Sequence, residues 1–452
     1  MNNMSESSTP PAVAESAPVT SAAATRSAAE TQKLVEKSLR RRYRAEQRFR
    51  AYGLAAVLSG IIFVVFLFGT ILMQGVSVFQ QSYVKLEVFY DPEIIDPTGE
   101  RDPDVLVTAN YQSLVRDALR ERFPDVSGRR DTRELYRILS SAASLDLQQR
   151  VVANPLLIGQ RETRWLLVDD NVDMLLKDKV ARDAPEEARR LTDQQLAWVE
   201  TLEADGILKL RFNRSFFSNG DSRDPEQAGV RGALMGSLLT LLITLLLSFP
   251  VGVGAAVYLE EFAPRNRLTD VIEVNINNLA AVPSIVFGLL GLAVFIGFFG
   301  MPRSAPLVGG LVLTLLTLPT IIIASRAALK AVPPSIREAA LGMGASRLQM
   351  VGHHVLPLAM PGMLTGAIIG MARALGESAP LLMIGMVAFI VDVPQGVMDP
   401  STALPVQVFL WSDLPERGFV ERTSGAIIVL LLFLLIMNAT AVVLRNKFEK
   451  RW

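Results

Sequence analysis

The sequence contains no cysteine and only two histidines, His353 and His354. Disulfides and thiolate metal sites are therefore excluded, and two histidines are too few for a histidine-based metal centre or catalytic triad. The pattern G-x-x-x-x-G-K-[ST], which cradles nucleotide phosphates, is also missing. We therefore expect no metal, no cofactor and no enzyme activity on this chain. If its work needs ATP, another chain must hydrolyse it.

Long apolar runs, by contrast, are abundant. Of the 452 residues, 50% are hydrophobic, and the mean hydropathy is +0.32. A helix needs about 20 apolar residues to cross a bilayer. Six stretches meet this length, so we predict a mainly α membrane protein with six transmembrane helices. The predicted helices lie at 51–73, 232–259, 274–302, 304–325, 360–391 and 423–444.

The net charge is zero, yet basic residues gather beside the first and last of these runs. Residues 31–50 hold eight Lys or Arg against two Glu, and the tail RNKFEKRW holds four against one. The positive-inside rule then places both ends of the chain in the cytoplasm, as an even number of helices requires. The long segment 75–228 is accordingly predicted to be extracytoplasmic.

Composition divides the chain into six parts. The first is rich in Ala, Ser, Thr and Pro, and we expect it to be disordered. The apolar run that follows the basic stretch is too long for a signal peptide and is expected to be an uncleaved anchor. The predicted boundaries are a disordered tail 1–30, a basic juxtamembrane segment 31–50, the first helix 51–74, the insert 75–228, the transmembrane domain 229–445 and a cytoplasmic tail 446–452.

The insert has the pattern of a soluble α+β domain. SYVKLEVFY (82–90) alternates like a strand, and GILKLRFNRSFF (206–217) is a second strand candidate. Asp131 with Glu134 is expected to cap one helix, and 184–204 is expected to form another.

Three acidic residues of the insert, Asp169, Asp170 and Asp173, suggest calcium at first sight. Their spacing lacks the EF-hand pattern and its glycine. We therefore favour a solvated turn, and no catalytic constellation is visible in the insert.

The predicted cytoplasmic loop SIREAALGMGASRLQMVGHHVLP spans 335–357. Ser335 can cap a helix with Glu338 three residues on, and the helix should turn at Gly342 or Gly344. A second short helix should then end at Pro357. Such a compact apolar knob, exposed to the cytoplasm, is typical of a docking surface.

This loop resembles the EAA loop of ABC-importer permeases. The matching residues are Glu338, Ala339, Ala340, Gly344, Leu356 and Pro357. The resemblance implies that the loop is the coupling helix, which docks in a groove of a separate ATPase subunit. The chain departs from the family at His354, where an aliphatic residue is preferred.

Further stretches of 229–452 are similar to phosphate permeases of the PstA type: SFPVGVGAAVYLEEFAP, NINNLAAVPSIVFGLLGL, LTLPTIIIASRAALKAVP and MARALGESAPLLMIG. The insert resembles an accessory domain of unknown function found on some of them. The resemblance implies a type I ABC-importer core that moves inorganic phosphate across the inner (cytoplasmic) membrane by alternating access. Its implied partners are a second homologous permease, an ATP-binding subunit dimer that uses ATP and Mg, an external phosphate-binding protein and membrane lipid, with no nucleic acid.

Arg373 and Glu377 lie inside the fifth apolar run. A charge in mid-membrane costs about 2.5–3.5 kcal/mol, whereas an exposed i,i+4 pair returns only about 0.3–0.5 kcal/mol. These residues should therefore face the bundle interior or a water-filled path. In one hypothesis Arg373 attracts the oxyanion, and Glu377 accepts the proton that phosphate carries and sulfate lacks. The alternative is a structural pair that fixes helix packing.

Asn277, Asn278 and Ser284, near the start of the third run, are weaker candidates for lining the path, and interhelical hydrogen bonding explains them equally well. Two other functions stay open. One is a permease for sulfate, molybdate or phosphonate, and the other is a membrane-anchored signalling or scaffold protein that acts through its insert.

Overall fold

A computed structural model describes residues 28–448. The expected disordered tail therefore lies outside the described residues, apart from 28–30, where the first helix has already begun. Residues 1–68 and 69–452 form two compact units, and each is described by itself. Helix α1 (Ala28–Gly75) spans the boundary between them, so the basic stretch 31–50 is helical and continuous with the first apolar run.

The second unit begins with the insert. Its elements are η1 Val76–Phe79, β1 Gln80–Phe89, α2 Pro92–Ile95, α3 Pro103–Thr108, α4 Tyr111–Arg122, α5 Arg129–Tyr136, α6 Ala142–Ala153, η2 Pro155–Leu157, β2 Arg161–Leu167, α7 Asp170–Leu176, α8 Glu186–Arg189, α9 Asp193–Ala204, β3 Leu208–Phe212 and α10 Arg214–Ser218.

The membrane core follows. Its elements are α11 Arg231–Val257, η3 Tyr258–Phe262, α12 Arg267–Ala280, α13 Ser284–Gly291, η4 Leu292–Phe298, α14 Pro306–Lys330, α15 Pro334–Gly342, α16 Arg347–Met350, η5 Val351–Val355, α17 Leu356–Gly376, α18 Ala379–Met383, α19 Leu404–Ser412 and α20 Arg417–Phe448.

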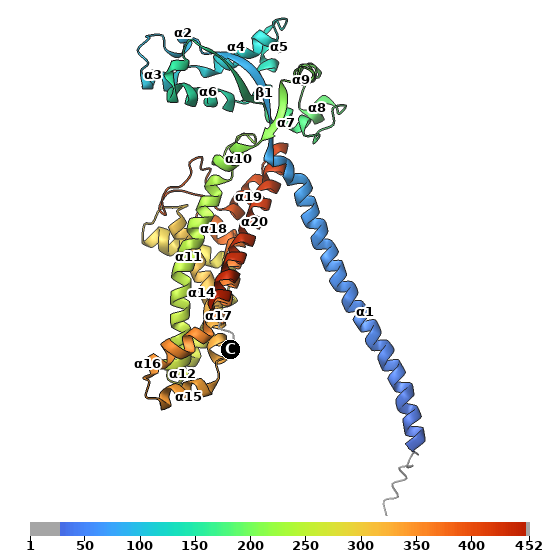
Figure 1. Ribbon diagram of the computed structural model, residues 1–452, viewed down its shortest axis with the longest axis vertical. Helices are drawn as coiled ribbons and strands as arrows, with labels where there is room; N and C mark the ends of the chain where they lie inside the picture. Colours follow the sequence, from blue (N-terminus) through green and yellow to red (C-terminus); the bar gives the residue numbers. More distant parts are fainter. Residues whose placement is uncertain (1–27, 449–452) are drawn as a thin grey trace, which may run out of the picture. The chain divides into compact units, whose positions relative to one another are not determined.

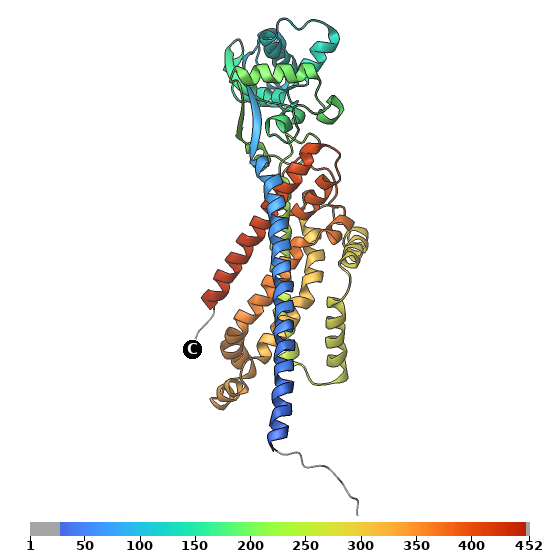
Figure 2. The ribbon, with the colours of Figure 1, turned by 90° about the vertical axis from the view of Figure 1, so that its right-hand side faces the viewer.

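A three-stranded antiparallel sheet organises the insert, with β1 between β2 and β3 (Figure 2). Val84 of β1 stands opposite Leu166 of β2 and Leu208 of β3, and all three side chains are buried. Because successive strand residues point to opposite faces, this alternation gives one face for the helices to cover. Both predicted strands, and the α+β class of the insert, are confirmed.

Two helix predictions for the insert are wrong in detail. The helix expected to start at Asp131 starts at Arg129, because Gly128 adopts φ +106°, a conformation that glycine permits, and breaks the chain there. The helix expected over 184–204 is interrupted: Arg190 is left-handed, and the Thr192 hydroxyl caps a new helix with Gln195 in a reciprocal box.

Five described helices are long and apolar enough to cross a membrane, and a bent pair makes a sixth if it is counted as one span. The five are Arg42–Phe79, Arg231–Phe262, Pro306–Lys330, Arg347–Gly376 and Arg417–Lys447. This agrees with the predicted mainly α membrane protein. Helices α11, α14 and α17 lie side by side (Figure 1), with Gly310 of α14 against Ile243 of α11 and Gly366 of α17 against Ala324 of α14.

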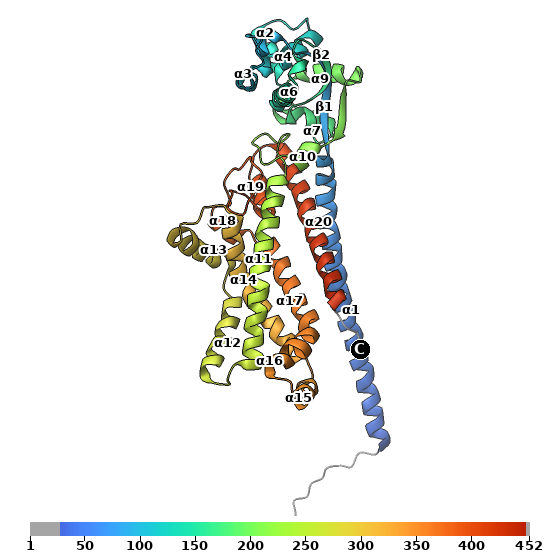
Figure 3. The ribbon, with the colours of Figure 1, turned by 60° about the vertical axis from the view of Figure 1, so that its left-hand side comes forward.

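The third predicted span, 274–302, is not one helix. It is broken after Ala280, and α12 and the helix that starts at Ser284 are bent by 101° (Figure 3). Pro283 explains the break, because it has no N–H to continue α12 and its fixed φ suits the start of a new helix.

The fifth predicted span, 360–391, also differs. The helix begins at Arg347 and ends at Gly376, so it is continuous with the second half of the 335–357 loop. Pro357 does not end a helix as expected. The π-helical turn 351–355 precedes it, and this wider turn accommodates the proline ring at the point where it would otherwise clash with the preceding turn.

Candidate functional site

The 335–357 loop folds as two short helices that turn at Gly344, whose φ is +84°. Pro334 occupies the first helical position, so Ser335 lies inside α15 and is not its cap, contrary to the sequence prediction. Ser346 caps the second helix with Gln349 in a capping box. The predicted turn is confirmed.

Exposed apolar side chains cover the loop. Leu341 is 44% exposed, Met343 78% and Leu348 73%. Ala340 is buried against Met350, Val351 and Val355 in a cluster that holds the two short helices together. The loop therefore has an inner face that anchors it and an outer apolar face without cover in this chain.

The predicted docking residues divide between these faces. Glu338 and Ala339 are exposed, Ala340 is buried, and Leu356 and Pro357 are half-buried where η5 joins α17. Glu338 makes no ion pair within 28–448, so its carboxylate is available to a partner.

Sequence reasoning missed the residue that fixes the loop to the core. The Arg337 guanidinium lies 2.7 Å from Glu261 Oε1 and donates to the backbone carbonyls of Val332 (2.7 Å) and Leu329 (2.9 Å). It thus joins α15 to η3, which follows α11, and to the end of α14. Charge-assisted bonds of this kind are strong and directional, so they fix the position of α15 against these two segments.

Glu260, beside Glu261, completes a second network. Arg326 of α14 lies 2.5 Å from Glu273 of α12 and 3.5 Å from Glu260, and Lys330 lies 3.6 Å from Glu260. The sequence did contain a signal for these ion pairs, the two adjacent glutamates of YLEEF (258–262). Two carboxylates at the end of an apolar helix need cationic partners nearby.

Arg373 and Glu377 lie at the end of α17. Their closest atoms, Arg373 Nε and Glu377 Oε1, are 3.6 Å apart, and the two side chains are 44% and 22% exposed. Their neighbours Ala374 and Leu375 are buried against the bundle, so Arg373 points away from this chain's own core. Arg373 therefore faces a surface that another molecule or water must cover. Of the two predicted surroundings, the bundle interior and a water-filled path, the second stays a prediction for Arg373.

Ser284 and Asn278 fall on opposite sides of the break in the third apolar run. Ser284 begins α13, which packs closely on α18 just after Glu377: a Cβ on Gly288 would lie 2.7 Å from Pro380 Cα. Asn278 is exposed on α12, and no hydrogen bond joins it to Arg373 or Glu377 within the described chain. The structure thus brings the helix that begins at Ser284 close to the segment that follows Glu377. Asn278 lies on α12 and is not part of this contact.

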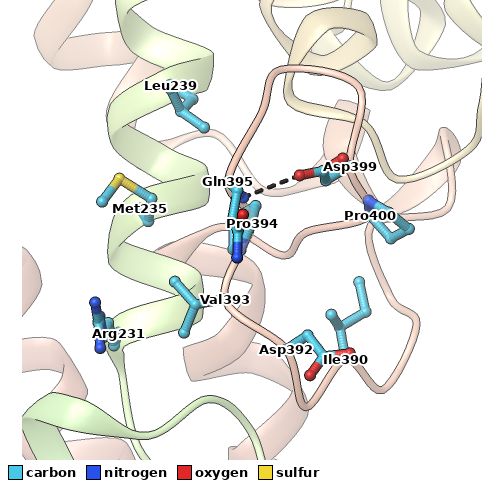
Figure 4. Close-up of a pocket in the computed structure, with 10 residues that line it drawn as sticks. All are labelled: Arg231, Met235, Leu239, Ile390, Asp392, Val393, Pro394, Gln395, Asp399 and Pro400. Carbon is cyan, nitrogen blue, oxygen red and sulfur yellow. Dashed lines mark hydrogen bonds between the residues drawn. The ribbon is translucent and has the colours of Figure 1, made fainter.

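A cavity of about 760 Å³ lies at the start of α11, between Arg231, Met235, Leu239 and the loop 390–400 (Figure 4). The loop is held by Asp399, which accepts hydrogen bonds from the backbone of Gln395 (2.9 Å) and Gly396 (2.7 Å). Since Glu261 follows the other end of α11, this cavity and the 335–357 loop lie at opposite ends of one helix. None of the predicted path residues lines the cavity.

The acidic residues 169–173 do not form a solvated turn, contrary to the prediction. Asp173 is buried, accepts a hydrogen bond from Ser82 N at 2.8 Å and lies 2.6 Å from Lys177 Nζ. Lys177 also lies 2.8 Å from Glu421 at the start of α20. The described residues contain no group of three or more His, Cys, Asp or Glu placed to hold a metal ion.

Two further carboxyl groups lie at this junction: Glu226 is buried and Asp170 is half-buried. Burial raises the pKa of Asp170 to about 7, and the neighbouring carboxylates of Asp173 and Asp169 add to the effect. Burial also raises the pKa of Glu226 to about 8, against the opposing effect of a 2.6 Å hydrogen bond from the Ser140 hydroxyl. This polar junction connects the insert to the membrane core.

A bundle of membrane-crossing helices that displays an exposed two-helix loop is the architecture of an ABC-importer permease. Residues 248–452 match the family described as binding-protein-dependent transport system inner membrane component. Residues 36–186 match a domain of unknown function, DUF3333, which begins within α1 and ends before the insert does.

Curated relatives agree with this assignment. The phosphate transport system permease protein PstA 1 of Mycobacterium tuberculosis is 34% identical over 231 residues, 50% of this chain and 74% of that protein. The probable ABC transporter permease protein YqgI of Bacillus subtilis is 31% identical over 253 residues, 52% of this chain and 84% of that protein.

The chain belongs to the binding-protein-dependent ABC permeases, among the phosphate permeases of the PstA type, so the family prediction is confirmed. Among solved structures, the MetNI methionine ABC transporter in an inward-facing conformation matches with a TM-score of 0.40 and 19% identity, over 49% of this chain and 96% of that one.

Proposed function

We propose that the chain is the permease subunit of an ATP-driven importer that moves inorganic phosphate across the inner membrane by alternating access. The observation that carries the proposal is the exposed 335–357 loop with its Glu338–Pro357 motif, in a chain that is 34% identical to a phosphate permease over 231 residues. The similarity to phosphate permeases favours phosphate over sulfate, molybdate or phosphonate. It also favours a transporter over a signalling or scaffold protein.

A separate ATP-binding subunit dimer drives transport in this proposal and uses ATP and Mg. Its groove receives the outer face of the loop, where Met343 and Leu348 supply apolar contact area and Glu338 supplies charge. Movement of the loop then reaches α14 and, by way of η3, α11 through Arg337, which contacts Glu261 of η3 and the end of α14. A second homologous permease and an external phosphate-binding protein complete the assembly. In the proposed topology both chain ends are cytoplasmic and 75–228 is extracytoplasmic.

The substrate path in this proposal runs along the surface of α17 that carries Arg373 and Glu377. Arg373 is 44% exposed in the single chain, and a charge facing lipid costs about 2.5–3.5 kcal/mol. An interface with the second permease, lined with water, removes that cost and leaves the guanidinium free to attract an oxyanion. Ser284 and Asn278 remain candidates for the same path.

The docking proposal is tested by replacing Met343 and Leu348 with aspartate. We expect the ATPase subunit to be lost on purification and radiolabelled phosphate uptake to fall to the level of cells lacking the chain. Leu145→Asp is the matched control, because Leu145 is also exposed (49%) but lies in the insert. If both proteins retain the ATPase equally, the 335–357 loop is not the docking surface.

The path proposal is tested with Arg373→Ala and Glu377→Gln, measuring surface level, assembly and phosphate uptake together. We expect normal assembly with uptake reduced at least tenfold for Arg373→Ala, and weaker selection against excess sulfate for Glu377→Gln. Normal uptake by Arg373→Ala would remove Arg373 from the path. If the variants instead fail to assemble with the partner subunits, Arg373 and Glu377 form a structural pair that fixes helix packing.

A further inference from the structure

Two neighbouring helices of the insert each carry a row of arginines. On α4, Gln112, Arg116 and Arg120 are spaced four residues apart, and on α5 the same spacing joins Arg129 and Arg133 and extends to Arg137 beyond its end. Residues four apart lie on one face of a helix, one turn above the other. Each helix therefore presents a basic stripe.

The two stripes line one hollow of about 780 Å³. Its walls hold five guanidinium groups and a single carboxylate, together with the hydroxyl groups of Thr132 and Tyr136 on α5 and of Ser141 after it. The complete lining is Gln112, Arg116, Arg120, Gly128, Arg129, Thr132, Arg133, Tyr136, Arg137, Leu139, Ser141 and Asp169. The one carboxylate is engaged elsewhere, since Asp169 accepts hydrogen bonds from the backbone (2.9 Å) and side-chain amide (2.8 Å) of Asn171.

Little within the chain neutralises this charge. Arg137 pairs with Glu134 at 3.3 Å, and Arg116 lies over the ring of Tyr136, 5.2 Å from its centroid. Arg120, Arg129 and Arg133 make no ion pair in the part of the chain that the structure describes.

Other arginines of the insert show a different environment. Arg150 lies 2.9 Å from Glu162, Arg161 3.1 Å from Glu121, and Arg182 2.8 Å from Glu203. The insert thus pairs these cations with carboxylates, whereas four of the five arginines that line the hollow have no such partner in the part of the chain that the structure describes. Like charges so gathered repel one another, and an anion placed between them relieves that repulsion.

We propose that this hollow binds a polyanion that carries more than one phosphoryl group. Guanidinium forks match phosphoryl oxygens in bidentate geometry. A volume of about 780 Å³ lies within the range of small-molecule pockets, and cations spread over two helices suit a ligand with charge at both ends. The site lies in the insert and does not depend on the proposed transport function.

The same phosphoryl chemistry has two possible sources, a soluble polyphosphate and an anionic lipid headgroup. The test measures tripolyphosphate binding to the full chain, purified with its partner subunits, by calorimetry at about 150 mM salt, where long-range attraction between exposed charges is largely screened. We expect saturable binding at one site per chain, at least tenfold weaker in Arg116→Gln/Arg133→Gln and unchanged in the control Arg182→Gln. Near-ultraviolet circular dichroism of each variant establishes that the insert is folded.

Repeating the titration in nanodiscs separates the sources. If a lipid headgroup is the natural occupant, phosphatidylglycerol discs weaken tripolyphosphate binding and phosphatidylcholine discs do not. If the occupant is soluble, both discs give the affinity measured in detergent. The proposal is overturned by an absence of saturable binding, or by equal affinities of Arg116→Gln/Arg133→Gln and Arg182→Gln. Phosphate uptake by the same variants is recorded separately, since it reports on the transport function alone.

Discussion

At the scale of single residues, Glu226 is an unusual buried acid. It stands just before α11, shielded from solvent, and accepts a 2.6 Å hydrogen bond from Ser140. Burial raises its pKa to about 8, and the negative charges of Asp169 and Asp170 add to the effect. Its folded form therefore holds a proton over a range of pH in which the unfolded chain has released it.

This gives stability a definite pH dependence. Between the unfolded pKa of about 4.5 and the folded pKa of about 8, the native state binds more protons than the unfolded state, so the free energy of unfolding falls as pH rises. The limit for one group is about 1.4 kcal/mol per pH unit. Asp170, with its pKa raised to about 7, contributes in the same direction.

Glu226→Gln removes the titrating proton and keeps an acceptor for the Ser140 hydroxyl. We expect the unfolding temperature of the purified chain to be several degrees above that of the unmodified chain at pH 8 and similar to it at pH 5. Thermal melts at both pH values, with the exposed Glu100→Gln as control, provide the measurement. The raised pKa of Glu226 would be contradicted if the substitution increased the unfolding temperature, relative to the native chain, more at pH 5 than at pH 8.

At the scale of elements, close helix packing explains why glycines recur on α17. Gly362, Gly366 and Gly370 are spaced four apart and form a small-residue stripe against α14. A Cβ on Gly362 would lie 2.6 Å from Ala328 Cβ, and one on Gly366 would lie 2.4 Å from Ala324 Cβ. Membrane helices use such stripes to bring backbones together, because lipid provides no hydrophobic force between them.

Gly366→Leu should therefore separate α14 from α17. Overpacking of this kind costs about 1–3 kcal/mol, and here the obstacle is another helix rather than a flexible side-chain end. We expect a lower unfolding temperature and a clear loss of phosphate uptake. Gly254→Leu is the matched control on α11, where a Cβ meets nothing within 4 Å. An equal melting temperature for Gly366→Leu and Gly254→Leu would show that the two helices adapt without cost.

The same scale shows what the sequence could predict. Apolar length located α11, α14 and α20, and period-two alternation located β1, because both signals are local. The bend at Pro283 and the continuation through Pro357 were mispredicted, because hydropathy averages over a proline and does not report which neighbouring turn accommodates it. The pairing of Arg337 with Glu261 depends on contacts between distant segments, which one sequence does not reveal.

The burial of the acidic residues 169–173 was mispredicted for the same reason, because it depends on contacts with distant residues. Three carboxylates close together in a sequence indicate an exposed segment, unless cations are known to lie beside them. Those cations are Lys177, one turn along the same segment, and Arg422, more than two hundred residues away at the start of α20. The arginine hollow was missed for the related reason that each stripe alone has the pattern of an ordinary solvated helix face.

At the scale of the whole molecule, the insert and the membrane core share a junction. An apolar cluster joins Val78 and Phe216 to Trp411 and Phe419, and the Trp411 indole donates to Asp221 at 2.8 Å. Beside it lies a polar group in which Lys177 touches both Asp173 and Glu421. The start of α20 is thus held by the insert, and α20 in turn contributes Phe433 and Met437 to the core that contains α17 residues.

Lys177→Met tests whether this junction fixes the insert to the core. Removing the cation leaves Asp173 and Glu421 buried and unpaired, and breaking a buried pair in this way costs about 3–5 kcal/mol. We expect the connecting segment 213–231 to become sensitive to trypsin, which can cleave at Arg214, Arg223 and Arg231, and we expect the melt to separate into two transitions. Lys209→Met, at an exposed position of β3, should keep a single transition and the native digestion rate. If Lys177→Met behaves like Lys209→Met, the insert is held by the apolar cluster alone and the buried charges contribute nothing to the connection.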